Sequence, residues 1–236
     1  DYVEKSDKLI FACGKGNPVS DKEDIVEKLP LISVVIPSKD NPAVLSTCIH
    51  SLLENTAGLD SSFGLEIIVV DNGSSIENRK RIEKMRLQLQ ENYRFSYHYQ
   101  EMPFNFSHMC NMGADLATGD YVLFLNDDIE IREENWLLKM MYQAMKLNVG
   151  AVGAKLLYPD GERIQHVGIT NIHLGPAHKL QFSSDKETYY MGYNRCPVNV
   201  LAVTGACMLM KKEAYDKVGG FDEKLQVSFN DVEICF

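Results

Sequence analysis

The stretch YVLFLNDD, residues 121–128, changes abruptly from five apolar or aromatic residues to an amide and two adjacent carboxylates. The apolar part predicts a buried β-strand, because strands of an open parallel sheet are covered on both faces. Ligands of such sheets collect beyond the carboxyl ends of the strands, where Asp127 and Asp128 would lie. Two carboxylates there can hold magnesium or manganese against phosphate oxygens. The alternative is a turn or a helix cap, for which Asn and Asp are common.

The composition indicates a globular α/β protein that does not bind nucleic acid. A chain of 236 residues, 45% of them hydrophobic, has enough core for one large domain or two small ones. Its net charge of -9 and its pI near 5.2 argue against a nucleic-acid partner, because such proteins usually present a basic face to phosphates.

Cysteine usage and hydropathy predict a cytoplasmic protein. The six cysteines form no C-x-x-C pair, so they indicate neither a zinc site nor a disulfide framework, and reduced thiols are expected. No apolar run is long enough to cross a bilayer, and the first residues lack the pattern of a signal peptide. We therefore expect at most peripheral association with the inner face of the cell membrane.

The chain divides into two parts by composition. Residues 1–30 combine charges, glycines and Pro18 with little core-forming pattern, and we expect a leader or linker there. Residues 31–236 form the second part, which is predicted to be a catalytic domain. The first residue is Asp1 and the last, Phe236, falls within a pattern, so we expect a C-terminally truncated fragment of a longer protein that carries further domains.

From Leu31 onward, strand and helix signals alternate. Short runs rich in β-branched residues are followed by segments in which apolar residues recur at helical spacing. The expected strands are 31–36, stopped by Pro37, then 65–70, 94–99 and 121–125, and the expected helices are 42–55, 76–90 and 106–117. This order predicts a mostly parallel, Rossmann-like sheet flanked by helices, with right-handed crossovers.

The second half has a more mixed pattern. A helix is expected near residues 134–146, then the apolar segment 149–157, a turn at 159–161 and an alternating segment at 164–169. The runs 198–203 and 206–210 flank Thr204 and Gly205, and the helix 211–218 ends at Gly219. A nucleotide-type first half joined to a variable second half suits an enzyme with two substrates.

Several of these segments together resemble the family 2 glycosyltransferases, which have the GT-A fold. The resemblance covers residues 31–236, and its motifs stand in the family's order. They are Ser33-Val34-Val35-Ile36-Pro37-Ser38-Lys39-Asp40, Ile67-Ile68-Val69-Val70-Asp71-Asn72-Gly73-Ser74, Asn111-Met112-Gly113-Ala114, Gly119 to Glu130, Val218-Gly219-Gly220-Phe221-Asp222-Glu223 and Phe229-Asn230-Asp231-Val232-Glu233.

The resemblance implies roles for the acids at the end of the opening stretch. The last acid, Asp128, matches the family's metal ligand, and Asp127 matches the acid that contacts the ribose or the metal. The expected ion is Mg2+ or Mn2+. Asn126 stands where many members have Asp; its amide could still bond a ribose hydroxyl but would bring no charge to the metal.

The nucleotide pocket is expected from the other strand ends. Asp71 matches an acid that accepts a hydrogen bond from a pyrimidine ring, which favours UDP or dTDP sugars, although Asp71-Asn72-Gly73 also suits a plain tight turn. The remaining expected contacts are Asn72, Asn105 and Asn111, with Pro37 and Lys39 acting mainly through their main chains. Asn111 could alternatively bond backbone near a helix.

The acceptor side has one predicted catalytic residue. Asp231 matches the family's base, which removes the acceptor proton opposite the leaving diphosphate and so gives inversion. Asn230 and Glu233 depart from the acids frequent at those positions, and Asn230 or Asp231 could instead cap a short helix. Gly205 would let an acceptor sugar approach the backbone.

Two histidines, His166 and His178, have both a functional and a structural interpretation. His178, followed by Lys179, could neutralise phosphate, and His166 stands in a similar segment. A lone histidine is more often a hydrogen-bonded structural residue, and we favoured that interpretation for both.

The resemblance implies an inverting, metal-dependent glycosyltransferase of bacterial surface-polysaccharide synthesis, such as a lipopolysaccharide O-chain or capsule. Its partners would be a nucleotide-diphosphate sugar donor and a glycan or lipid-linked glycan acceptor. A sugar-phosphate nucleotidyltransferase would need a Gly-rich, Arg-containing loop after the first strand, which the segment 37–40 does not supply. A non-catalytic sugar-nucleotide or glycan-binding module stays open, and a receiver-type domain fits neither the length nor the second half.

Overall fold

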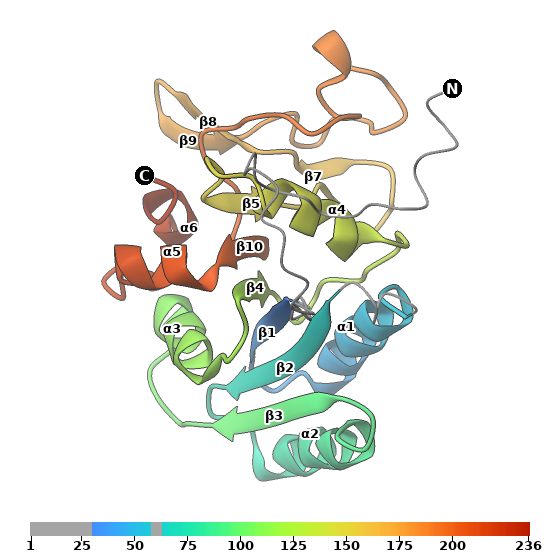
Figure 1. Cartoon of the computed structure of the whole chain (residues 1–236), viewed down its shortest axis with the longest axis vertical. Helices are drawn as coiled ribbons and strands as arrows, with labels where there is room; N and C mark the ends of the chain where they lie inside the picture. The colour runs from blue at the N-terminus through green and yellow to red at the C-terminus, as the bar shows by residue number, and fades with distance from the viewer. Residues whose placement is uncertain (1–29, 58–62) are drawn as a thin grey trace, which may run out of the picture.

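The computed structural model describes residues 30–57 and 63–236, and almost all of the predicted leader, residues 1–29, lies outside them. Its centre is a six-stranded sheet in the order β3-β2-β1-β4-β10-β5 (Figure 1). Strands β1 to β4 are parallel, and β10 pairs antiparallel with both β4 and β5. The fold is therefore the expected α/β class, with a mostly parallel sheet.

The first half consists of consecutive strand–helix units, as the sequence predicts. Its elements are β1 (Leu31–Ser38), α1 (Pro42–Glu54), β2 (Gly64–Asp71), α2 (Ile76–Leu89), β3 (Arg94–Tyr99), α3 (Phe106–Leu116) and β4 (Tyr121–Leu125). The chain adds β2 and β3 on one side of β1 and then places β4 on the other side. The sheet therefore has a topological switch point between β1 and β4, where open α/β sheets bind ligands.

One boundary differs from the prediction. Strand β1 does not stop before Pro37 but continues to Ser38, with Pro37 in register with Val70 of β2. The carbonyl of Ser38 accepts from the N–H of Asn72, just after β2, so the backbone groups of Ser38 face β2. Successive residues of a strand face opposite sides, so the N–H that Pro37 lacks would face β4. On the β4 side, pairing with β1 ends at Val35, so Pro37 removes no hydrogen bond between the two strands.

The second half is mixed, again as predicted. Its elements are α4 (Trp136–Ala144), β5 (Ala151–Gly153), β6 (Leu156–Leu157), β7 (Ile164–His166), β8 (Ile169–Ile172), β9 (Gly175–His178), η1 (Tyr190–Gly192), β10 (Cys207–Lys211), α5 (Lys212–Val218) and α6 (Asn230–Glu233). Strands β6 and β7 pair, as do β8 and β9, in small antiparallel sheets that lie on the β5 side of the central sheet (Figure 1).

The core has two sides because alternate residues of each strand face opposite ways. Val34 of β1 packs with apolar residues of α1, α2 and α4, whereas its neighbour Val35 packs with residues of α3 and α5. The central strands are completely buried, and this explains their continuous apolar sequence. Burial on both faces fixes their carboxyl ends, and with them the polar residues that follow.

Candidate active site

The switch point joins the ends of β1 and β4 through one side-chain bond. The hydroxyl of Ser38 donates to Oδ2 of Asp127 at 2.6 Å, although the two residues are 89 positions apart in the chain. Ser38 is 3% exposed, so its hydroxyl is fixed by the strand that carries it. The predicted metal and ribose acids therefore lie where the fold places a ligand.

Asp127 and Asp128 differ in environment. Burial and, to a lesser extent, the neighbouring charge of Asp128 raise the pKa of Asp127, and the bond from Ser38 opposes that rise. Asp128 is exposed and free to meet a ligand. A partly buried carboxylate with a raised pKa gains from a nearby cation, so the pair has a donor chemistry that fits a divalent ion.

The fit to a metal depends on ligands beyond the protein. The residues that the structure describes contain no cluster of three or more His, Cys, Asp or Glu side chains able to enclose an ion. Mg2+ and Mn2+ do not require such a cage, since Mg2+ in particular is often held by one or two carboxylates together with water and substrate phosphates. The observed pair suits an ion that arrives with a diphosphate.

Asn126 connects the end of β4 to the acceptor half. Its main-chain N–H donates to the carbonyl of Ala206 at 2.9 Å, and its own carbonyl accepts from the thiol of Cys48 at 3.5 Å. The side-chain Oδ1 is buried and has no partner among the described residues. An unsatisfied acceptor at a strand end is consistent with a missing water or ligand donor.

The end of β2 is more enclosed than predicted. Asp71 is fully buried, and its carboxylate accepts from the hydroxyl of Tyr97 and, at 3.0 Å, from the N–H of Ser74. Asn72 is also fully buried, and neither side-chain amide atom has a partner in the described chain. Contact of either side chain with a nucleotide would need this loop to open, and both assignments stay predictions.

The loop after β1 is held against α2. Asp40 adopts a left-handed conformation with φ of 52°, and its carboxylate accepts from the N–H of Ser75 at 2.7 Å. That bond and the one from Asn78 lower the pKa of Asp40. Pro37 is buried and Lys39 is exposed, and the predicted main-chain contacts of both residues with a nucleotide stay predictions.

Asn105 and Asn111 are both committed to bonds within the chain. Asn105 caps α3 by accepting from the N–H of His108 at 3.0 Å and donates to the carbonyl of Glu223 at 2.9 Å. Asn111 donates to the carbonyl of Phe221 at 3.0 Å and accepts from its N–H at 2.9 Å. The alternative of backbone bonding therefore describes Asn111, and the nucleotide role of both residues stays a prediction.

The predicted base and the predicted acceptor-side glycine meet. Oδ2 of Asp231 accepts from the N–H of Gly205 at 3.1 Å, and a Cβ added to Gly205 would lie 3.5 Å from Cβ of Asp231. Neither Asn230 nor Asp231 stands at the N-cap position of α6, which Phe229 occupies. Asn230 still bonds the start of the helix, because its Oδ1 accepts from the N–H of Asp231 at 2.9 Å while its Nδ2 donates to Oγ of Ser107 at 2.9 Å.

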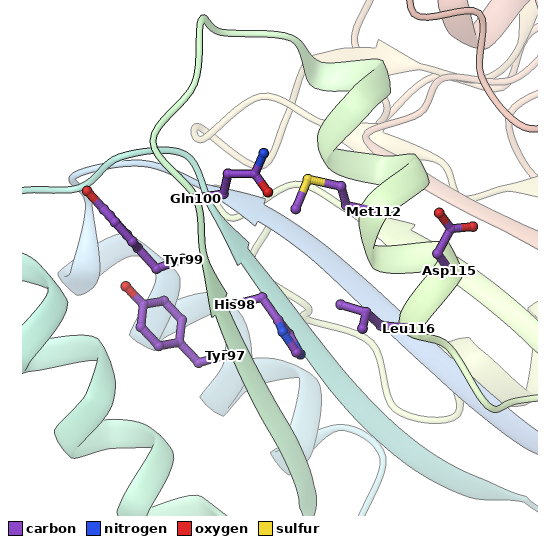
Figure 2. A pocket seen from close by; sticks show the side chains of 7 residues that line it. All are labelled: Tyr97, His98, Tyr99, Gln100, Met112, Asp115 and Leu116. Atoms are coloured by element: carbon purple, nitrogen blue, oxygen red, sulfur yellow. The ribbon is translucent and has the colours of Figure 1, made fainter.

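A separate hollow lies at the free edge of the sheet. It has a volume of about 490 Å³ and lies between β3 and the C-terminal half of α3 (Figure 2). Its lining residues are Tyr97, His98, Tyr99, Gln100, Met112, Asp115 and Leu116. None of them is a predicted site residue, so this open hollow and the switch point are distinct candidates for ligand binding, and the carboxylates favour the switch point.

Some residues of the site had not been assigned from the sequence. Ser38 lies in a recognised motif but was not given a role, and Tyr97 was only part of an expected strand. Their bonds to Asp127 and Asp71 depend on strand order and on which face each side chain occupies. His166, favoured as structural, proves to bond the backbone of Thr204 beside Gly205.

The domain thus joins a mostly parallel sheet, with two acids at its switch point, to an antiparallel strand, β10, and the turn before β10 contacts a third acid, Asp231. The chain belongs to glycosyl transferase family 2, whose family model matches residues 33–219. The resemblance noted in the sequence is therefore confirmed for the family and the fold.

The chain spans less than a quarter of the length of two curated relatives that it matches. The chain is 35% identical over 214 residues to the O-antigen biosynthesis protein RfbC of Myxococcus xanthus, and 36% identical over 219 residues to protein y4gI of Sinorhizobium fredii. These matches cover 89% of this chain in both cases, but only 16% and 23% of the relatives' own lengths.

Solved structures confirm the architecture. A mannosyltransferase from Pyrobaculum calidifontis, solved with GDP-Man and Mn2+, matches with a TM-score of 0.63 at 16% identity, over 88% of this chain and 51% of its own. GalNAc-T7, solved with UDP, GalNAc and Mn2+, matches with a TM-score of 0.64 at 17% identity, over 89% of this chain and 40% of its own. At these identities the likeness shows the fold alone. Among the described residues, no helix combines the length and apolarity needed to cross a bilayer.

Proposed function

We propose that this domain is an inverting, metal-dependent glycosyltransferase that moves a sugar from a nucleotide diphosphate to a hydroxyl of a glycan or lipid-linked glycan. The observation that carries the proposal is a chain of contacts at the end of β4. Ser38 bonds Asp127, the main chain of the preceding residue, Asn126, bonds Ala206, and the N–H of Gly205 bonds Asp231. These contacts support a site in which the acids for the diphosphate and the base for the acceptor lie together at the carboxyl end of β4.

In this mechanism Asp128 and Asp127 would hold the ion, and a bound Mg2+ or Mn2+ would supply positive charge to the departing diphosphate. Asp231 accepts the proton of the acceptor hydroxyl as its oxygen attacks the anomeric carbon, and the bond from that carbon to the diphosphate oxygen breaks. Direct displacement leaves the product with inverted configuration. The N–H of Gly205 keeps one carboxylate oxygen of Asp231 occupied, so the other remains for the proton.

The proposal also names the donor nucleotide and the kind of glycan that is assembled. Uracil and thymine present a ring N–H that the carboxylate of Asp71 would accept once the loop after β2 opens, and this supports UDP or dTDP over GDP. The relative of Myxococcus xanthus carries the description O-antigen biosynthesis, which supports assembly of a bacterial surface polysaccharide. We place the protein in the cytoplasm, with at most peripheral association with the inner face of the cell membrane.

Release of nucleoside diphosphate tests the proposal. The full chain is incubated with UDP, dTDP and GDP sugars and glycan acceptors, with Mn2+ or Mg2+ and with EDTA. We expect release from a UDP or dTDP sugar that EDTA abolishes, and an inverted anomeric proton signal in the product. Asp231→Asn should lower turnover by about 10²- to 10⁴-fold while donor binding survives.

Other results would point elsewhere. Metal-dependent nucleotide binding without turnover on any acceptor would favour a non-catalytic binding module. Full turnover in EDTA would contradict the metal-dependent mechanism, and undiminished turnover in Asp231→Asn would remove the proposed base.

A further inference from the structure

Two histidines form a bonded pair next to the acceptor-side turn. Nδ1 of His166, at the end of β7, lies 2.8 Å from Nδ1 of His178, at the end of β9, and the two rings meet edge to face. His166 is 1% exposed, whereas His178 is partly exposed. The pair therefore runs from the surface into the interior.

The bonds of His166 determine where its proton lies. Its Nε2 faces the N–H of Gly168 at 3.2 Å and the N–H of Thr204 at 3.3 Å, and backbone N–H groups can only donate. Nε2 must therefore be the unprotonated nitrogen, and Nδ1 carries the hydrogen. Since Nδ1–H of His166 donates to His178, Nδ1 of His178 must accept, and His178 satisfies the hydrogen that the two backbone donors leave on Nδ1 of His166.

The buried ring anchors the segment that holds the proposed base. The N–H of Thr204 donates to His166, and the N–H of the next residue, Gly205, donates to Asp231. A second connection runs through the backbone, where Ile169 bonds Ala202, and Ile169 and Ala202 both pack against Val232 of α6. Two adjacent N–H groups of one turn thus point to the histidine and to the carboxylate.

We propose that His166 is a positioning residue for the acceptor-side base, with His178 as the hydrogen-bond acceptor that holds the ring of His166 in place. This inference rests on the proposed function of Asp231. The imidazole fixes the Thr204–Gly205 turn, and the turn fixes the direction of the Asp231 carboxylate. An acid whose bond to the turn is loosened meets the acceptor hydroxyl less often in the correct geometry, and misplacement by about 1 Å can cost about 10²-fold in rate.

Four variants separate this role from simple packing. His166→Phe keeps a flat ring but removes the acceptor, whereas His166→Gln places an amide oxygen near the position of Nε2. His178→Phe removes the acceptor of Nδ1–H of His166. His173→Phe is the matched control, because His173 is exposed in the same β8–β9 hairpin.

We expect His166→Phe to lower kcat about 10- to 100-fold with the KM for the donor unchanged within about twofold, and His166→Gln to recover most of the loss. His178→Phe should fall between them, and His173→Phe should match the parent. In an Asp231→Asn background, His166→Phe should have little further effect, because residues that act as one unit are not additive.

The outcomes distinguish the two ideas. If Asp231→Asn lowers turnover as expected but His166→Phe lowers kcat by the same factor with and without Asp231, the positioning role is wrong while the proposed function stands. If Asp231→Asn leaves turnover intact, the proposed base is wrong.

A readout independent of turnover covers variants that fold poorly and donors that are not found. In the unmodified chain, imidazole ¹⁵N shifts should show His166 protonated at Nδ1 and unprotonated at Nε2. The Gly205 amide should be protected from exchange, and His178→Phe should reduce that protection while His173→Phe does not. A His166 protonated at Nε2, or a Gly205 amide insensitive to His178→Phe, would overturn the proposal.

Discussion

Asp127 shows how one residue can be costly to the fold and suited to a ligand. Its carboxylate accepts from Ser38 but lies partly buried beside Asp128, and the net result is a raised pKa. An acid whose pKa is higher in the folded than in the unfolded state favours folding when protonated. That contribution is lost as the pH rises through the raised pKa, so at neutral pH the charge of Asp127 destabilises the empty domain.

Asp127→Asn should therefore stabilise the protein while weakening its proposed site. The amide oxygen can still accept the bond from Ser38, and the buried charge is gone. We expect the Tm at pH 7 without metal to rise by about 2 °C, and the stabilisation by UDP with Mn2+ to disappear. Differential scanning fluorimetry measures both. Asp128→Asn is the control. Because Asp128 is exposed, this variant should lose the stabilisation by UDP with Mn2+ but gain little in Tm. A lower Tm for Asp127→Asn would contradict the argument.

His166 should make the domain sensitive to acid. Burial, with a smaller effect of His178, lowers the pKa of His166 to about 3, whereas an unfolded histidine titrates near 6.5. Between these values the unfolded chain binds one more proton, so this residue makes stability fall as the pH falls. We expect the free energy of unfolding in urea to lose up to about 1.4 kcal/mol per pH unit more in the parent than in His166→Gln. His173→Gln should leave the slope unchanged, and equal slopes in all three proteins would refute the expectation.

At the scale of elements, the sequence is most informative where elements are long and regular. The boundaries of α1, β3 and β4 agree with the pattern to within one residue, because burial on one or both faces imposes a strict period. Strands β5 to β9 have only two to four residues, too few for a period to show. The end of β1 was misplaced because the effect of Pro37 depends on which neighbour its missing N–H faces.

Helix α3 packs closely on the sheet through one glycine. A Cβ added to Gly113 would lie 2.2 Å from Cγ1 of Val35 in β1, so Gly113→Ala must separate the helix from the strand. We expect a loss of about 1–3 kcal/mol in the free energy of unfolding, despite the better helix propensity of alanine. Gly150→Ala is the matched control, since its added Cβ would have no atom within 4 Å. Equal stabilities from urea titration would show that α3 does not pack as described.

The whole molecule explains which parts of the site could be predicted. Acids at the carboxyl ends of parallel strands must lie at the same end of the sheet, so the sequence could place Asp71 and Asp127 there. The contact of Asp127 with Ser38 also requires that β4 pair with β1, which the structure shows. The contact between Gly205 and Asp231 depends on β10 pairing antiparallel with β4, and no local pattern reports that pairing. The enclosure of Asp71 likewise depends on Tyr97 from the neighbouring strand.

The largest expected effect of a ligand acts on the whole domain. A diphosphate nucleotide that binds only the folded chain stabilises it by mass action, by about 2.7 kcal/mol at a concentration one hundred times its Kd. For a domain of this size we expect UDP with Mn2+ to raise the Tm by about 5–10 °C, and EDTA to reverse the rise, because the acids alone would repel the diphosphate. Asp128→Ala should abolish the shift. Asp115→Ala should retain it, since Asp115 lines the hollow between β3 and α3 (Figure 2). A shift lost in Asp115→Ala but kept in Asp128→Ala would move the nucleotide from the switch point to that hollow.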